Sequence, residues 1–343
     1  MPERPADLTN LTDEEILDLR ICDLPIGIKG TWIEKCIEEL YRELNLKGIG
    51  FKPPCYLADE WLTPDNEPVI GIAFFLAHPK LIRLENKIML EVEGGTKSWC
   101  LKLLRHETGH ALNYAYKLYR RKKWQEVFGK FSKEYTDTYR FRPYSKSFVR
   151  HLEDYYAQYH PDEDFAETFA VWLNPHSNWR NQYKGWKALN KLNYVDKVIS
   201  EIKNKPPLIS QGKKYWQASK LKTRIKNYYK KKREFWAEYF PDFHDSNLKK
   251  IFSSDSSVNK GLIPAVQILK KYRKNILDSV SLWTGEKKYV IDNLLKNLSE
   301  RCKDLNLTAN EPETNTCMKV SIYTTVLIMN YLHTGRFRKK KWK

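Results

Sequence analysis

Two histidines and a glutamate lie at a spacing that suits metal chemistry. Residues 106–110 read His106-Glu107-Thr108-Gly109-His110, an H-E-x-x-H pattern. Because residues four apart share one face of an α-helix, both imidazoles can reach one metal ion. A catalytic zinc ion takes such nitrogens, one further protein ligand and a water, whose proton a neighbouring carboxylate accepts. The pattern predicts Zn²⁺ bound by His106 and His110, with Glu107 as the general base.

The residues around the pattern favour a helix. Between Thr96 and Arg121 there is no proline and only one interior glycine. Gly109 costs about 1 kcal/mol relative to alanine in a helix, so we expect another element to approach the chain closely there. The basic run 120–123 is typical of a helix C-terminus, where cations meet the negative end of the dipole. The alternative is an exposed helix in which the three residues fell at this spacing by chance.

A third metal ligand must come from elsewhere in the chain. Metzincins would require His at 116 and Gly at 113, but the chain has Tyr116 and Asn113, which excludes that class. Residues 161–173 begin with proline and carry aromatic residues at helical spacing, so they predict a second helix. Glu163 and Glu167 share a face of it. One can bind the metal, and the other can orient a ligand imidazole through its free N–H.

The two segments together resemble a known family. H-E-x-G-H followed by E-D-F-A-E-T-F-A is similar to the gluzincin metallopeptidases, in particular a bacterial group of zinc-binding metallopeptidases, and to the catalytic domain of anthrax lethal factor. Residues 179–196 extend the resemblance. It implies a zincin-like fold, with Glu163 as the third zinc ligand and Glu167 supporting a ligand imidazole. It also implies that Tyr156, seven residues before Glu163, hydrogen-bonds the developing oxyanion.

Some neighbours of these residues are alternatives. Tyr155 and Tyr159 compete with Tyr156, since the chain has 21 tyrosines. His160 is a second candidate for the third ligand, although a histidine just before a helix-starting proline is more typical of a cap. A stretch of 52 residues separates His110 from Glu163, and we expect it to lie over or beside the active-site cleft.

The elements that must position these residues predict an α+β fold. Two capping boxes, at Thr12 to Glu15 and at Thr31 to Glu34, begin helices, and the second helix should end near Leu46. We expect a small mixed sheet before the metal-binding helix, as in a zincin. The strand at the edge of the sheet would pair with extended substrate backbone, and either Val69–Leu76 or Lys87–Glu93 could be that strand. The candidate strands are Gly50–Leu57, Val69–Leu76 and Lys87–Glu93.

The rest of the chain is expected to be largely helical. We assign residues 1–250 to a zincin-like domain, with the sheet and active-site helix in 1–125 and the ligand helix and a helical subdomain in 126–250. Residues 251–343 would form a helical C-terminal extension with a basic tail. Its expected helices are Val258–Leu282 and Lys287–Leu305, and a serine-rich break lies at 253–257.

Composition limits the class of protein. Among the 343 residues, no apolar stretch approaches the 18 or so needed for a transmembrane helix, so we expect no membrane partner. The N-terminus lacks the pattern of a secretory signal. The six cysteines form no C-x-x-C, as expected for reduced thiols in a cytoplasmic protein.

The net charge of +18 is unevenly distributed. Residues 1–120 hold 15 Lys and Arg against 19 Asp and Glu, whereas residues 181–240 hold 16 against 4. Residues 213–240 interleave aromatic and basic side chains. They predict either a nucleic-acid footprint or an amphipathic helix with aromatics in the core and a solvated lysine face, which we favour. The basic tail Arg336–Lys343 is a further candidate for nucleic-acid attraction.

These observations predict a zinc-dependent metallopeptidase acting on a peptide or protein substrate. The alternative is a nucleic-acid-associated protein that uses its basic helical half, including a protease acting on DNA-bound proteins. A zinc site kept only for structure is a third hypothesis. Glu107 argues against it, because a structural site needs no base and usually has four protein ligands.

Overall fold

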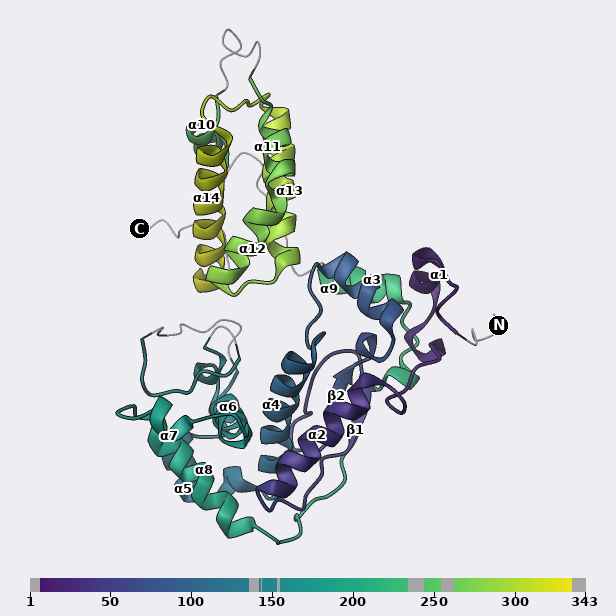
Figure 1. Cartoon of the computed structure of the whole chain (residues 1–343), viewed down its shortest axis with the longest axis vertical. Helices are drawn as coiled ribbons and strands as arrows, with labels where there is room; N and C mark the ends of the chain where they lie inside the picture. Colours follow the sequence, from purple (N-terminus) through teal and green to yellow (C-terminus); the bar gives the residue numbers. More distant parts are fainter. Residues whose placement is uncertain are drawn as a thin grey trace. The chain divides into compact units, whose positions relative to one another are not determined.

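The chain divides into two compact units. The computed structural model describes residues 7–135, 142, 144–152, 155–233, 244–253 and 262–334 (Figure 1). One unit comprises Met1–Lys87 and Val92–Tyr229, and the other Ile88–Glu91 and Lys230–Lys343. The division thus falls between Tyr229 and Lys230, and the boundary we expected at residue 250 lies within helix α10 (Asp245–Ile251). The secondary structure is mixed, with many helices and one small sheet, which agrees with an α+β class.

The first unit begins with two helices. Helix α1 (Asp13–Asp18) has the expected capping box, since Glu15 accepts from the Thr12 N–H at 2.7 Å and Thr12 Oγ1 accepts from the Glu15 N–H at 3.2 Å. Helix α2 (Trp32–Leu46) has the expected bounds, but its capping box is wrong. The Thr31 hydroxyl donates to a preceding carbonyl instead, and Glu34 accepts from Gly30, whose left-handed φ of 78° turns its N–H towards that carboxylate.

The sheet is small and parallel among the described residues. Strand β1 (Cys55–Ala58) pairs with β2 (Ile70–Ala73), with Cys55 opposite Ile70. Strand β1 is shorter than expected because Pro53 and Pro54 precede it and cannot donate to a ladder. On its other side β2 forms an antiparallel bridge, in which Leu62 and Gly71 exchange hydrogen bonds of 2.8 and 3.2 Å. The chain after β2 turns into a 3₁₀ helix, η2 (Phe74–Ala77).

The expected strand Lys87–Glu93 is wrong. Its first residues belong to helix α3 (Pro79–Met89), and the chain leaves the helix at Leu90, which has a φ of 63°. Leu81 and Leu84 are buried at helical spacing. This pattern begins well before the short alternation at 88–93, and the helix therefore includes Ile88 and Met89.

The helix with the H-E-x-x-H pattern is α4 (Lys97–Ala115), and Thr96 caps its N-terminus. It ends earlier than expected. Lys117 adopts a left-handed φ of 49°, and 3₁₀ helix η3 (Leu118–Arg120) and helix α5 (Lys122–Phe128) follow. The prediction that the run 120–123 ends α4 is therefore wrong, because two of its lysines begin α5.

The second predicted helix is α6 (Pro161–Leu173), which begins at its proline as expected and lies beside α4 (Figure 1). A Cβ on Gly109 would lie 2.7 Å from the Ala166 Cα, so the expected close approach at this glycine is confirmed. On another side, α6 contacts helix α8 (Ala188–Ile202), and a short helix, α7 (Trp179–Gln182), precedes α8.

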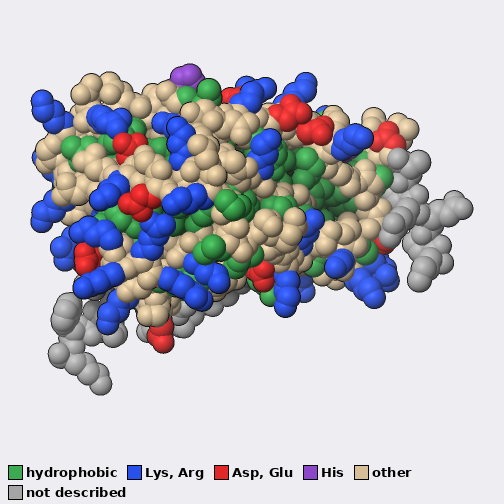
Figure 2. All heavy atoms as spheres, turned by 90° about the horizontal axis from the view of Figure 1, so that it is seen from below, with side chains coloured by type: hydrophobic (Ala, Val, Ile, Leu, Met, Phe, Trp, Pro, Cys, Tyr) green, Lys and Arg blue, Asp and Glu red, His purple; other side chains and the backbone are tan. Residues whose placement is uncertain are grey.

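The basic segment 213–240 is partly described. In helix α9 (Ile225–Arg233), Ile225 and Tyr229 are buried, and Lys226 forms an ion pair of 2.6 Å with Asp18. This agrees with the amphipathic alternative for these residues, while Phe235, Trp236 and the tail 336–343 lie outside the described residues. On the face shown in Figure 2, Lys and Arg side chains lie among acidic and apolar ones. A nucleic-acid partner stays a prediction.

The second unit is helical in its described part. It contains α10, α11 (Ala265–Lys271), α12 (Arg273–Thr284), α13 (Lys288–Asp304) and α14 (Glu313–Thr334). Of the helix expected at Val258–Leu282, residues 258–261 lie outside the described residues, and the rest contains two helices, α11 and α12. Helix α13 agrees with the expected Lys287–Leu305. No helix in the described ranges is both long and apolar enough to span a membrane. A cytoplasmic location stays a prediction.

Candidate metal centre

Helices α4 and α6 bring three potential metal ligands together. His106 Nε2 lies 3.2 Å from His110 Nε2, and each of these atoms lies 3.2 Å from Glu163 Oε2. All three side chains are buried, and together they could hold a metal ion. They converge because Gly109 has no side chain, so the backbone of α6 at Ala166 can approach α4 closely at this position.

The other nitrogen of each imidazole is held by a carboxylate. Glu167 Oε1 lies 2.8 Å from His106 Nδ1, and Asp162 Oδ2 lies 2.9 Å from His110 Nδ1. An ionised carboxylate only accepts hydrogen bonds, so Nδ1 must carry the proton in both rings. A neutral ring then has a bare lone pair on Nε2, which is the form that binds metal.

Three electron-rich atoms therefore face one another in a buried space. Without a cation, two Nε2 lone pairs and a carboxylate oxygen at these distances would repel one another. Ligands at about 2.0–2.1 Å from a tetrahedral zinc ion lie about 3.3 Å apart. The observed separations of 3.2 Å are close to that value. The donor set thus fits an ion of this size.

Asp162 organises the side of the site that holds His110. Besides the imidazole, it accepts hydrogen bonds from the Tyr114 hydroxyl at 2.6 Å and from Asn113 Nδ2 at 2.7 Å. Both donors lie on α4, one turn after His110. The sequence analysis missed Asp162. Its place directly before Glu163, in the first turn of the ligand helix, was the available signal.

Three tyrosines lie near Glu163 and His106. Tyr135 donates from its hydroxyl to Glu163 Oε1 at 3.0 Å and stacks on His160 with ring centroids 3.9 Å apart. This residue was also missed, since it lies in a loop that no motif marks. Tyr156 begins 3₁₀ helix η4 (Tyr156–Gln158), and its ring centroid is 5.7 Å from that of His106. Tyr159 lies beside it, 5.9 Å away by ring centroids.

His160 is engaged as a cap rather than as a ligand. Its Nδ1 accepts from the Asp162 N–H at 3.1 Å, at the N-terminus of α6. Its Nε2 donates to the Lys133 carbonyl at 2.7 Å. With both ring nitrogens used in this way, the alternative third ligand has no atom to offer to the centre.

The electrostatics of the cluster favour a positive charge at its middle. Burial lowers the pKa of His106, but hydrogen bonds with Glu163 and Glu167 outweigh burial and raise it to about 9. Burial also opposes the charged form of His110, yet Asp162 and Glu163 raise its pKa well above the usual value. Burial acts to raise the pKa of Glu163, but the two imidazoles lower it overall. All three pKa shifts favour a positive charge between the two imidazoles and Glu163.

Glu107 lies where α4 meets the strands. It is buried, and burial is the main cause that raises the pKa of its carboxyl group. Its backbone carbonyl accepts from Thr63 Oγ1 at 3.1 Å, next to the Leu62 bridge to β2. A carboxylate with a raised pKa is a better proton acceptor at neutral pH than an ordinary one.

Comparison of the chain with protein-family models, with curated proteins and with solved structures gave no match. The resemblance of its motifs to gluzincin metallopeptidases therefore stays a prediction. Function must be inferred from the geometry of the site.

Proposed function

We propose that the chain is a zinc-dependent metallopeptidase of the gluzincin type, with a zincin-like first unit. His106, His110 and Glu163 would hold Zn²⁺. The observation that carries this proposal is the convergence of three buried acceptor atoms at 3.2 Å, with both imidazole N–H groups held by carboxylates. Two imidazoles with one carboxylate are a usual ligand set of catalytic zinc.

The ligand set favours a catalytic site over a structural one. Among the described residues, only these three His, Cys, Asp or Glu side chains come together as a potential metal group. Structural zinc sites almost always have four protein ligands, whereas catalytic sites keep one position for water or substrate. Glu107, directly after the first ligand, supplies the base that such chemistry requires.

In the proposed reaction, each residue of the site has a separate chemical role. When bound, zinc would supply Lewis acidity, which lowers the pKa of water and polarises a peptide carbonyl. Glu107 would accept a proton from the attacking water and pass it to the leaving amine. Glu167 and Asp162 would keep the imidazoles oriented with Nε2 towards the ion. Tyr156, beside His106, would donate to the developing oxyanion.

The substrate would be a peptide or protein segment bound in extended form. Because residues 87–89 form the end of α3 and Leu90 then adopts a left-handed φ of 63°, this segment is not an edge strand. Strand β2 is paired at Gly71 with Leu62. The segment around Leu62 is thus the remaining candidate for β-augmentation, and its neighbour Thr63 bonds the Glu107 carbonyl.

Glu107→Gln tests the proposal. The amide preserves the shape of the side chain but cannot accept the proton, so peptide cleavage should fall by about 10²–10⁴-fold. Zinc content should stay at one ion per chain. Cleavage is measured by mass spectrometry of new peptide ends in a digest of denatured proteins, with the metal content of each preparation. Glu126→Gln, an exposed change on α5, serves as the matched control. Cleavage retained in Glu107→Gln would contradict the role of Glu107.

A further inference from the structure

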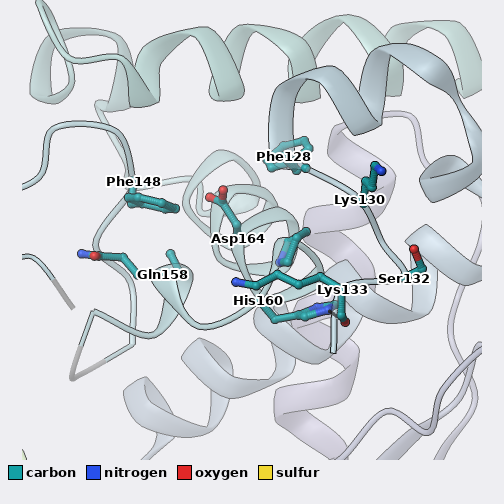
Figure 3. Close-up of a pocket in the computed structure, with 11 residues that line it drawn as sticks. Phe128, Lys130, Ser132, Lys133, Phe148, Gln158, His160 and Asp164 are labelled. Carbon is teal, nitrogen blue, oxygen red and sulfur yellow. Dashed lines mark hydrogen bonds between the residues drawn. The ribbon is translucent and has the colours of Figure 1, made fainter. Parts of the chain in front are cut away.

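A second site lies on another face of the ligand helix. A pocket of about 460 Å³ is bordered by the end of α5 with the segment that follows it, by η4 and by the first turn of α6 (Figure 3). Its volume is within the range of roughly 300–1,000 Å³ that is usual for small-ligand pockets. It differs from the metal centre in its walls, since Glu163 contacts α4 whereas Asp164 contacts Lys191 on α8.

Asp164 provides a buried polar atom without a partner. The side chain is about 2 % exposed, and its Oδ2 accepts from Lys191 Nζ at 2.5 Å. Its Oδ1 is buried but has no hydrogen-bond partner in the part of the chain that the structure describes. Such an atom normally costs free energy, and native proteins leave few of them. Because Asp164 lines the pocket, a ligand that brings a donor would satisfy it.

Positive charge predominates around this carboxylate. Lys133 extends across the space near Asp164 in Figure 3, and it has no ion-pair partner within the described ranges. Lys130 also lines the pocket, and Lys191 already neutralises the single acid. Among the described residues, neither Lys130 nor Lys133 forms an ion pair, which favours an anionic ligand.

Two aromatic rings flank the carboxylate in this pocket. Phe128 and Phe148 lie on either side of Asp164 in Figure 3, and Lys191 Nζ covers the Phe148 ring at 3.9 Å. Gln158 is already engaged, since it exchanges hydrogen bonds of 2.8 and 3.1 Å with the backbone of Arg142. The pocket therefore suits a ligand that brings a hydrogen-bond donor for Asp164 Oδ1, an anionic group for Lys133 and an apolar group for the aromatic rings.

We propose that this pocket binds an apolar amino-acid residue that has a free carboxylate and an acylated nitrogen. Lys133 would hold the carboxylate, Asp164 Oδ1 would accept from the amide N–H, and the side chain would lie against the exposed parts of the Phe128 and Phe148 rings. An N-acylated amino acid and the carboxyl-terminal residue of a peptide share this chemistry. The site does not depend on the metallopeptidase proposal, because none of its groups takes part in that reaction.

Calorimetric titration of the full chain with N-acetyl-L-phenylalanine tests the site. We expect one ligand per chain. N-acetyl-L-phenylalaninamide lacks the carboxylate and 3-phenylpropionate lacks the N–H, so each should bind at least about tenfold more weakly, as expected for one hydrogen bond to a charged group. Acetyl-Ala-Ala-Phe distinguishes the two sources: equal or tighter binding indicates peptide ends, and loss of binding indicates a small metabolite.

Variants assign the binding to this pocket. Lys133→Gln should raise the Kd at least about tenfold, whereas Lys122→Gln, the same charge change outside the pocket, should not alter it. Both residues are exposed, so the fold should persist, and equal melting temperatures check this. Binding of a carboxylate at the metal centre would not depend on Lys133, so this variant separates the two sites. Unchanged affinity in Lys133→Gln, or no binding of N-acetyl-L-phenylalanine and none of acetyl-Ala-Ala-Phe, would overturn the proposal.

Discussion

The two units of the chain bury different kinds of side chain. Helices α4 and α6 of the first unit bury a set of ionisable groups: His106, Glu107, His110, Asp162, Glu163, Asp164 and Glu167. The described core of the second unit is built from aliphatic side chains such as Leu248, Ile268, Ile276, Ile291 and Ile328. Its buried acid Asp292 has cation partners that reach solvent, Arg273 at 2.5 Å and Lys296 at 2.9 Å.

This difference indicates that the buried ionisable groups of the first unit need a stabilising partner, whereas the core of the second unit does not. A buried ionised group costs several kcal/mol unless it is paired, and the groups of α4 and α6 are paired mainly with one another. A cation at the centre of the cluster would compensate them. The aliphatic core of the second unit needs no such partner. Metal binding should therefore affect the first unit and leave the second unchanged.

Removal of a metal ligand should lower zinc affinity more than any other change considered below. Glu163→Ala leaves two imidazoles and no carboxylate at the centre, so zinc affinity should fall by more than the roughly 10–100-fold expected for a supporting residue. Zinc per chain after gel filtration measures this. His160→Ala is the control: it removes the α6 cap at about 1 kcal/mol of stability but should keep the metal. A Glu163→Ala chain with full zinc would remove this residue from the ligand set.

Loss of a supporting carboxylate should have a smaller effect. Asp162→Ala removes the partner of His110 Nδ1 and leaves two donors of α4 unpaired, so zinc affinity should fall about 10–100-fold. Competition with a chelator of known affinity measures the change. Asp292→Ala removes a buried acid of the second unit and should leave zinc affinity as it is. Equal effects of the two variants would contradict the contrast between the units.

A change in packing should have the smallest effect on the metal. In Gly109→Ala the new Cβ meets the backbone of Ala166 at 2.7 Å, so α6 must shift away from α4. We expect a loss of about 1–3 kcal/mol in unfolding free energy, together with weaker zinc binding. Gly27→Ala, where nothing lies within 4 Å, should change neither quantity. Denaturant unfolding monitors the first effect. A neutral Gly109→Ala would show that the contact between the helices tolerates an added methyl group.

Local periodicity accounts for what could be predicted from the sequence. The bounds of α2, the start of α6 and the close approach at Gly109 follow from helix spacing, proline placement and the cost of glycine in a helix, all of which act over a few residues. The same reasoning failed where two local signals compete. Alternation at 88–93 predicted a strand, but a longer helical pattern continues to Met89 and no strand forms at 90–93.

The missed residues depend on contacts between distant parts of the chain. Asp162 is close to His110 in space but 52 positions away, and Tyr135 reaches Glu163 across 28 positions. No spacing rule specifies such pairs. The basic run 120–123 shows the same limit, because a left-handed residue at Lys117 ends α4 before the run begins.

Zinc titration of the metal-free full chain, followed by differential scanning calorimetry, measures whether zinc binds and whether it stabilises the first unit alone. We expect one zinc ion per chain, and we expect the unfolding transition of the first unit to be stabilised by about 4 kcal/mol when free zinc is at a thousandfold excess over its Kd. The transition of the second unit, identified by Ile291→Ala, which destabilises it, should not move. Failure to bind zinc, or equal stabilisation of both transitions, would contradict a metal centre between α4 and α6.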